Sequence, residues 1–289
     1  MVFAQLILYG IVLGSILALA AVGVSLIFSQ LRFAHFAHGD MVTFGAYFGL
    51  LFTGTLALPL YLAFPLALAA TGLLAVGIDQ LLYRRLRRSQ PVILLISSIG
   101  VALMLRSVIQ MVWGPDNRNY GGGGISFPYE FLGLRIKPEQ IVIIVGTVLL
   151  VTALHLFLTR TKTGKAMRAT ADNASLARVT GIDTERVILW AWIITAVLAA
   201  AAGLFLGLDT RLNPMMGWRI LLPIFAAALV GGIGNYYGAI AGGLLIGLSQ
   251  ELSTAVISPA YKPAVAFAIM VLVLILRPRG IFARRREAA

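Results

Sequence analysis

The chain has 289 residues, of which 60% are hydrophobic and only 12% are charged. Several apolar runs reach roughly 18 residues or more, which the surface of a water-soluble domain would not tolerate, so the sequence predicts an integral membrane protein. The net charge of +12 does not indicate nucleic-acid binding, because Lys and Arg cluster in a few short loops between apolar runs. There is no cysteine, which excludes disulfides, thiolate metal sites and Cys nucleophiles.

Apolar runs follow one another along the whole chain. The first begins at Val2 with no basic segment before it and is too long for the core of a signal peptide, so we expect a retained span. Hydropathy predicts spans over residues 3–28, 40–57, 60–82, 91–113, 139–159, 187–208, 220–233, 238–257 and 262–277. The run 220–233 reaches only about two-thirds of a roughly 30 Å hydrocarbon core, which suits half of a broken helix. The predicted fold is all-α and polytopic, with eight or nine transmembrane helices in a single transmembrane domain, residues 1–289.

Lys and Arg are unevenly divided between the loops, which predicts the orientation of the chain. Most follow the odd-numbered spans: Arg32, Arg84, Arg85, Arg87, Arg88, the basic residues of 160–186, and Arg277, Arg279, Arg284, Arg285 and Arg286. Fewer lie on the other side: Arg118, Arg135, Lys137, Arg211, Arg219 and Lys262. The excess predicts a cytoplasmic C-terminus and, with nine spans, an external N-terminus. The longest outer loop, 114–138, holds the glycine run 121–124 and Pro128, so we expect an irregular surface there for an external partner.

One long polar stretch, residues 159–186, interrupts the apolar sequence. Its middle is rich in alanine and Gly181 suits a helix end, so a helix is predicted near 163–182. Basic residues run through this stretch, and spans flank it on both sides, so the helix is expected on the cytoplasmic side. A helix joined directly to two spans can transmit a rigid-body movement to them.

A glycine pattern recurs along the chain at a separation of 193 residues (232 − 39). Gly39, Gly45, Ala46, Gly49 and Gly54 recur as Gly232, Gly238, Ala239, Gly242 and Gly247. This predicts two repeat copies near 10–113 and 187–277, a plan that many transporters use. The two copies would run in the same direction, or be inverted if one neighbouring segment does not cross. For the glycines at 234–243, close helix packing is the favoured interpretation and shaping of a substrate path the other.

Three blocks, Leu17 to Tyr47, Thr161 to Ile182 and Phe225 to Leu252, resemble a known family. It comprises the inner-membrane permease subunits of bacterial ABC importers for branched-chain amino acids and related hydrophobic amino acids and amides. The chain departs from the family where Phe33 and Ala34 precede the His35 block, since Asn is frequent there. Because of this departure, the resemblance predicts the fold more firmly than it predicts the substrate.

The resemblance implies a multi-component importer in the bacterial inner membrane. The chain would pair with a second permease, identical or homologous, and with two cytoplasmic ATPase subunits that bind ATP and Mg²⁺. A periplasmic binding protein would deliver the substrate. The chain itself would bind no cofactor and would not be an enzyme. The middle block would be the coupling helix that seats in the ATPase, and the residues that fit the family pattern there are Gly164, Ala166, Arg168, Ala169, Asn173, Ala177, Gly181 and Ile182.

A polar group, His35, His38 and Asp40, follows the first span. It offers too few ligands for a metal site. Two interpretations stay open: these side chains satisfy backbone groups freed at a helix break, or they belong to an inner gate.

Arg106 and Glu251 are the ionisable residues deepest in the predicted spans. They lie about 22 and 20 Å from the cytoplasmic ends of their spans, so we expect them to form a buried ion pair. The pair would either lock helix packing or contact substrate. The predicted translocation-path or gate residues are His38, Gly39, Asp40, Arg106, Gly232, Gly234 and Glu251.

The sequence thus predicts the permease of an importer for branched-chain or other hydrophobic amino acids. Urea, short amides, aromatic acids or sugars remain alternative substrates. A secondary transporter or channel acting alone is a rival class, but it would need ion-coupling residues in the spans and leaves the polar helix unexplained. No phosphate-binding loop is predicted at Thr163–Ala166, because Ala166 stands where Ser or Thr should follow Lys165. No cluster of catalytic groups indicates an enzyme.

Overall fold

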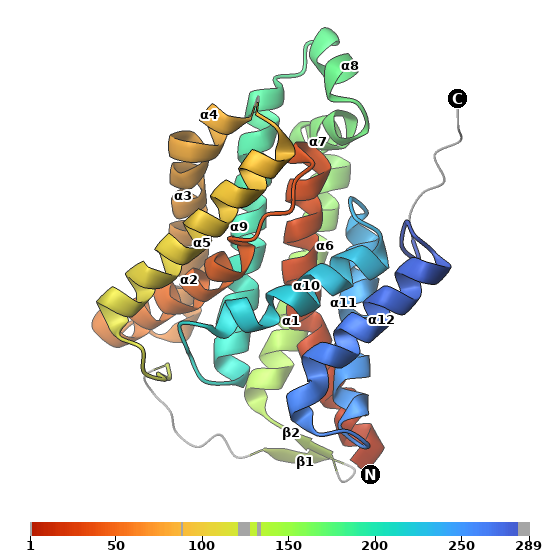
Figure 1. Ribbon diagram of the computed structural model, residues 1–289. Helices are drawn as coiled ribbons and strands as arrows, with labels where there is room; N and C mark the ends of the chain where they lie inside the picture. The colour runs from red at the N-terminus through yellow and green to blue at the C-terminus, as the bar shows by residue number, and fades with distance from the viewer. Residues whose placement is uncertain (1, 88, 121–127, 132–133, 283–289) are drawn as a thin grey trace.

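A computed structural model of the chain describes residues 2–87, 89–120, 128–131 and 134–282. Within them the fold is a bundle of helices with one short hairpin, β1 (Tyr129–Phe131) and β2 (Leu134–Ile136), so the predicted all-α class is confirmed (Figure 1). The helices are α1 (Val2–Leu31), α2 (His38–Leu50), α3 (Leu60–Ile78), α4 (Arg84–Leu86), α5 (Pro91–Trp113), α6 (Pro138–Arg160), α7 (Lys162–Asp172), α8 (Ala174–Val179), α9 (Thr184–Asp209), α10 (Met216–Gly231), α11 (Tyr236–Ser253) and α12 (Lys262–Leu276). Three short helical turns complete the list: π-helical Leu51–Thr55 and Asp79–Tyr83, and 3₁₀ Pro259–Tyr261.

The hairpin partly corrects the expectation for the outer loop. Tyr129–Phe131 and Leu134–Ile136 form paired strands in place of irregular chain, with Glu130 opposite Arg135. The glycine run 121–124 lies outside the described residues, as do Arg88 and the arginines at 284–286.

Six helices of the described chain are long and apolar enough to cross a membrane. They cover Val2–Leu31, Leu60–Leu86, Pro91–Trp113, Pro138–Arg160, Thr184–Asp209 and Pro259–Leu276. The remaining predicted spans are α2 and α10, which are shorter, at 13 and 16 residues, and α11, which has 18 residues but is less apolar. The membrane class is therefore confirmed, whereas the predicted number of eight or nine full spans is only approximate.

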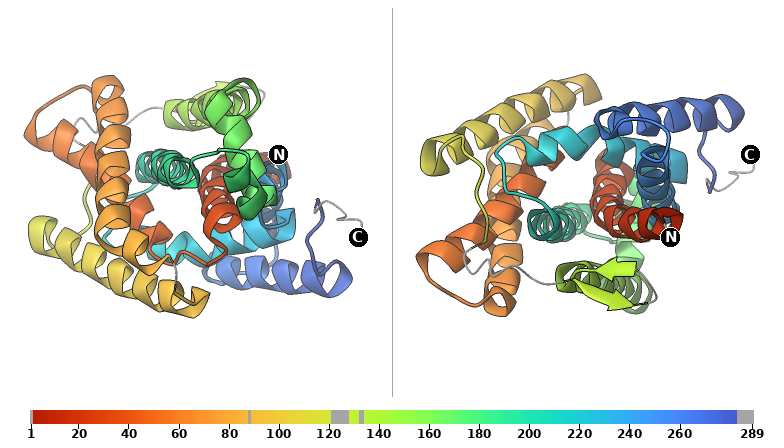
Figure 2. Two further views of the ribbon diagram at one scale, coloured as in Figure 1. Left: turned by 90° about the horizontal axis from the view of Figure 1, so that it is seen from above. Right: turned by 90° about the horizontal axis from the view of Figure 1, so that it is seen from below.

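The centre of the bundle is formed by α1 and α9 (Figure 2). Within their apolar windows 83% and 67% of the residues are buried, against 22% in α6 and 6% in the α12 region. Small residues permit this close packing. A Cβ atom on Gly243 of α11 would lie 2.5 Å from the Cα atom of Ala18 in α1. The packing interpretation of the glycines in α11 therefore agrees with the geometry.

The chain between α1 and α2 is not helical, although it runs through the interior. Phe33, His35 and Ala37 are buried there, and the backbone N–H of Phe36 donates to Ser98 Oγ of α5 at 3.1 Å. An unpaired amide would be costly at this depth, so the serine stabilises the break. α2 and α10 are short and strongly tilted relative to α1 (Figure 1).

α1 and α9 run in opposite directions (Figure 1), and their neighbours correspond: α2 and α3 pack on α9, while α10 and α11 pack on α1. This pattern fits an inverted relation between the two halves better than a parallel one. The sequence-matched glycines do not take equivalent places, since Gly39 lies in the first turn of α2 and Gly232 follows the last turn of α10.

One end of the molecule carries α7, α8 and the end of α1 (Figure 1). Arg32, Lys165, Arg168 and Arg279 meet at this end around one cavity, and we call it the basic end. The N-terminus and the hairpin lie at the opposite end.

Candidate functional site

The polar stretch at the basic end forms two helices rather than the single helix predicted near 163–182. Thr161 caps α7 by accepting a hydrogen bond from the N–H of Gly164 at 2.9 Å. Asn173 leaves the helical conformation and caps α8, its Oδ1 accepting from the N–H of Leu176 at 3.0 Å. Gly181, at φ +86°, follows α8. The predicted helical character is confirmed. The helix breaks at Asn173 because an asparagine side chain readily accepts a hydrogen bond from a backbone N–H in the first turn of a helix.

α7 is held rigidly against the bundle. A Cβ atom on Gly164 would lie 2.5 Å from the Cα atom of Leu158 in α6, so only glycine permits this approach. Gln30 donates to the carbonyl of Met167 at 3.0 Å, and Arg32 donates to the carbonyl of Ala171 at 2.9 Å. Movement of α7 would therefore be passed directly to α6 and α1.

α8 presents apolar side chains away from the bundle. Val179 is 85% exposed and Leu176 is also exposed, whereas Ala177 is buried. Leu176 and Val179 lie three residues apart, so they form a small apolar surface on one side of α8. The sequence analysis missed Leu176 and Val179, although their apolar character inside a polar stretch was the available signal.

A cavity of about 1130 Å³ opens beside α7 at the basic end. Its basic lining residues are Arg32, Lys165, Arg168 and Arg279, and its apolar ones include Phe28, Leu158, Leu229 and Leu274. Gly234 also lines it, in the turn between α10 and α11, with φ +86° and its N–H donating to Ser25 Oγ at 2.9 Å. Gly232 lies in the same turn, at φ +99°. These two predicted path residues therefore lie at the basic end, in a turn that needs glycine geometry.

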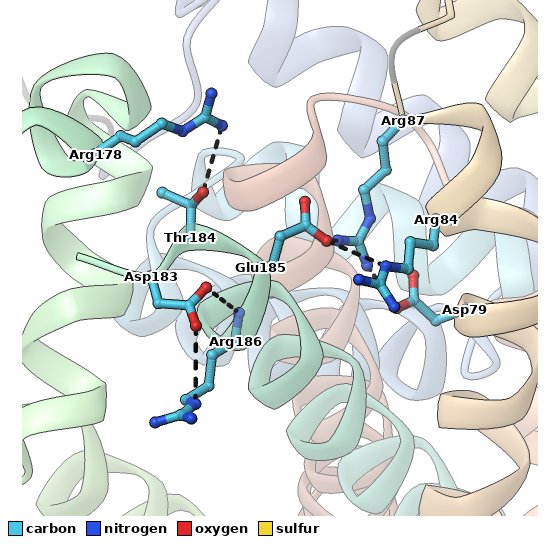
Figure 3. A network of polar contacts seen from close by, with 8 residues as sticks. All are labelled: Asp79, Arg84, Arg87, Arg178, Asp183, Thr184, Glu185 and Arg186. Carbon is cyan, nitrogen blue, oxygen red and sulfur yellow. Dashed lines mark hydrogen bonds and ion pairs between the residues drawn. The ribbon is translucent and has the colours of Figure 1, made fainter. Parts of the chain in front are cut away.

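An ion-pair network joins the start of α9 to the end of α3 (Figure 3). Arg87 contacts Asp79 at 2.5 Å and also pairs with Glu185 of α9, while Arg84 lies 3.6 Å from Glu185. Asp79 is almost fully buried and Arg87 is 10% exposed. Arg178 of α8 reaches Thr184 at 3.4 Å, so the network continues to α8.

The predicted polar group His35, His38 and Asp40 is only partly brought together. The two histidine rings lie 6.3 Å apart, and His35 packs edge-on against Trp192, which in turn stacks on Tyr83. Neither ring nitrogen of His35 has a hydrogen-bond partner within the described chain. The described residues hold no cluster of three His, Cys, Asp or Glu that could bind a metal ion.

The predicted ion pair between Arg106 and Glu251 is wrong. Arg106 pairs with Asp40 through two hydrogen bonds, Nε to Oδ1 at 3.0 Å and Nη2 to Oδ2 at 3.1 Å. Glu251 instead contacts Lys262, at 2.6 Å, across the short turn before α12. Similar depth was the basis of the prediction, but depth does not show which way a side chain points around its helix.

Trp218 of α10 completes the surroundings of this pair, with the Arg106 guanidinium 4.6 Å from the centre of its ring. Next to Asp40 in the chain, Gly39 contacts Gly217, so the first turns of α2 and α10 touch. The hydroxyl group of Thr43 links the two turns by hydrogen bonds. The sequence analysis did not single out Trp218, because nothing in its local sequence points to Arg106. Outside the spans, burial raises the pKa of the Tyr120 phenol, which donates to the Ala46 carbonyl at 3.1 Å.

Comparison with known proteins gives a consistent result. Residues 6–274 match the family model for the branched-chain amino acid transport system permease component. The chain is 33% identical to the branched-chain amino acid permease LivH of Salmonella typhimurium and 32% identical to BraD of Pseudomonas aeruginosa, in each case over 98% of this chain and 96% of the relative. A solved structure, PsaBC from Streptococcus pneumoniae in complex with Fab, shares the fold at a TM-score of 0.53 and 12% identity, covering 94% of this chain and 91% of that chain. The protein therefore belongs to the family of permease components of branched-chain amino acid transport systems.

Proposed function

We propose that this chain is the membrane subunit of an ABC importer that carries branched-chain or other hydrophobic amino acids across the bacterial inner membrane. The main observation that supports this proposal is the similarity to LivH along nearly the whole length of both chains. No observation on the described residues favours urea, aromatic acids or sugars. By the distribution of Lys and Arg, the basic end faces the cytoplasm, as does the C-terminus.

The proposed seat of the ATPase is the pair α7–α8. Three features support it: α7 is fixed to α6 and α1, α8 exposes Leu176 and Val179, and the neighbouring cavity is basic. ATP and Mg²⁺ would then be bound by two separate ATPase subunits. Within this seat we assign coupling roles to Gly164, Ala166, Arg168, Ala169, Asn173, Ala177 and Gly181.

Movement of α8 would reach the rest of the bundle through Glu185. This carboxylate lies in the first turn of α9 and pairs with Arg87, which holds the buried Asp79 at the end of α3. α5 begins four residues after Arg87, at Pro91. The network therefore links the proposed ATPase seat to the helix that carries Arg106.

A second permease, identical or homologous, would cover the face that α5, α10 and α12 share (Figure 2). Apolar side chains are exposed on all three helices, among them Met104, Leu222 and Leu272. The α12 region has the smallest buried share of the candidate spans, 6%. A path between two permeases would run along this face. The periplasmic binding protein would dock at the opposite end from α7–α8.

Reconstitution tests the function directly. The permease is produced with a partner permease, ATPase subunits and a binding protein from the same organism, and uptake of labelled leucine into proteoliposomes is measured. We expect uptake that requires both ATP and the binding protein. Uptake driven by an ion gradient without ATP would instead identify a secondary transporter and overturn the proposal.

A further inference from the structure

Asp40 and Arg106 form an ion pair whose two members differ in accessibility. The Asp40 side chain is fully buried, whereas the Arg106 side chain keeps 12% of its surface exposed. Asp40 occupies Nε and Nη2 of the guanidinium, and Nη1 donates no hydrogen bond within the part of the chain that the structure describes. The guanidinium therefore keeps one donor group for a further acceptor.

The exposed side of the pair lies on the face that α5 and α10 share. Trp218 covers the guanidinium at 4.6 Å and is itself 40% exposed. Leu222, one turn after Trp218 on α10, and Leu103, one turn before Arg106 on α5, are exposed apolar side chains on the same sides of their helices. A solute that moves along this face would meet an indole ring, apolar side chains and one cation.

Arg106 lies close to the end of α5 at which an incoming solute would enter. Arg106 stands seven residues before the end of α5 at Trp113 (113 − 106), which is about 10 Å at 1.5 Å per residue. That end is opposite the basic end, so it is the end from which an imported substrate would enter. The pair would therefore be reached early in the passage.

We propose that Asp40, Arg106 and Trp218 form a transit site for the zwitterionic head group of an amino acid with an apolar side chain. The proposal rests on the proposed importer function and adds the site and the chemistry that it recognises. The substrate carboxylate accepts a hydrogen bond from Nη1 of Arg106, while Asp40, which is buried behind the guanidinium, holds that side chain in position. The apolar side chain packs on Trp218.

The balance of charges makes substrate binding at this site feasible inside a membrane protein. A zwitterion meeting an ion pair leaves the net charge of the site unchanged, so no isolated charge is created at low dielectric. Charge-assisted hydrogen bonds to the guanidinium favour a carboxylate. The contacting first turns of α2 and α10 add partial positive charge on the same side. A solute without a carboxylate would lack these interactions.

The test compares leucine uptake with binding-protein-stimulated ATP hydrolysis in the same proteoliposomes. The variants are Trp218→Leu and the double variant Asp40→Asn with Arg106→Gln, which keeps the shape of the pair and removes its charges. We expect uptake to fall about tenfold in each, because the double variant loses the charge-assisted contact and Trp218→Leu loses the ring that packs on the substrate, while hydrolysis stays within about twofold of the unmodified protein. Trp190→Leu, a similarly exposed tryptophan on α9, is the matched control and should change neither quantity.

Two results would overturn the site. The first is uptake at the unmodified rate in the double variant. The second is a parallel loss of uptake, hydrolysis and thermal stability in both variants, which would assign the pair to packing alone. If the unmodified complex shows no ATP-dependent uptake, the importer function itself is wrong, so the two failures are distinguishable.

Discussion

Gly39 and Gly217 bring the first turns of α2 and α10 into direct backbone contact: a Cβ atom on Gly39 would lie 2.7 Å from the carbonyl oxygen of Gly217. Thr43 reinforces the contact, since its hydroxyl donates to the Gly39 carbonyl at 3.2 Å and accepts from the Gly217 N–H at 3.1 Å. Two short helices from distant parts of the sequence thus start at one point, directly beside the Asp40–Arg106 pair.

Replacing Gly39 by alanine should destabilise the bundle. The added methyl group meets backbone, which cannot move aside as a side-chain tip can, so a cost of about 1 to 3 kcal/mol is expected. The midpoint of thermal unfolding in detergent measures it. Gly100→Ala in α5 is the control, because a Cβ atom there meets nothing within 4 Å, and it should be neutral or stabilising. Equal midpoints for the two variants would contradict the proposed contact.

The seating of α7 on α6 gives a prediction about coupling. Gly164→Leu places a side chain against the backbone of Phe157 and Leu158, which must tilt α7 away from α6. Binding-protein-stimulated ATP hydrolysis should continue while leucine uptake falls about tenfold or more, because α7 no longer transmits its movement rigidly. Gly77→Leu in α3, where nothing lies within 4 Å, serves as the control and should retain coupled uptake. Coupled transport by the Gly164 variant would refute this role.

The exposed apolar residues of α8 predict a partner surface. Val179→Asp should weaken retention of the ATPase subunit during purification, because a carboxylate would then be buried against it. The folded permease itself should be unaffected, since Val179 contacts solvent in the isolated chain. Tyr129→Asp, a replacement at an exposed position of the opposite end, should leave ATPase retention unchanged. If both variants retain the ATPase equally well, α8 is not its seat.

Sequence reasoning recovered what depends on local composition. Hydropathy located the long helices, and the polar stretch was correctly expected to be helical, because both signals lie in neighbouring residues. The preference of asparagine for helix starts could have predicted the split at Asn173, but a single helix was expected there.

The partners of the buried charges could not be found in this way. Arg106 and Glu251 were matched by depth, yet the choice of Asp40 depends on the rotation of α5 and on the helix break that places α2 beside it. The same limit applies to Trp218 and to the Arg87 network, whose members come from separate parts of the chain. Such contacts are set by tertiary packing, which one sequence without relatives does not encode in any local pattern.

The Arg87 network yields a prediction that separates its buried and exposed members. Arg87→Gln leaves the carboxylate of Asp79 buried without its cation, which should cost about 3 to 5 kcal/mol in unfolding free energy. Glu185→Gln removes a partner whose side chain is 52% exposed, so at most about 1 kcal/mol is expected. Combining Asp79→Asn with Arg87→Gln should recover much of the loss, because no uncompensated charge then remains. Thermal unfolding of the three variants is the measurement. If Glu185→Gln destabilises the protein as much as Arg87→Gln does, the loss at Arg87 comes from its contact with α9 and not from an unpaired Asp79 carboxylate.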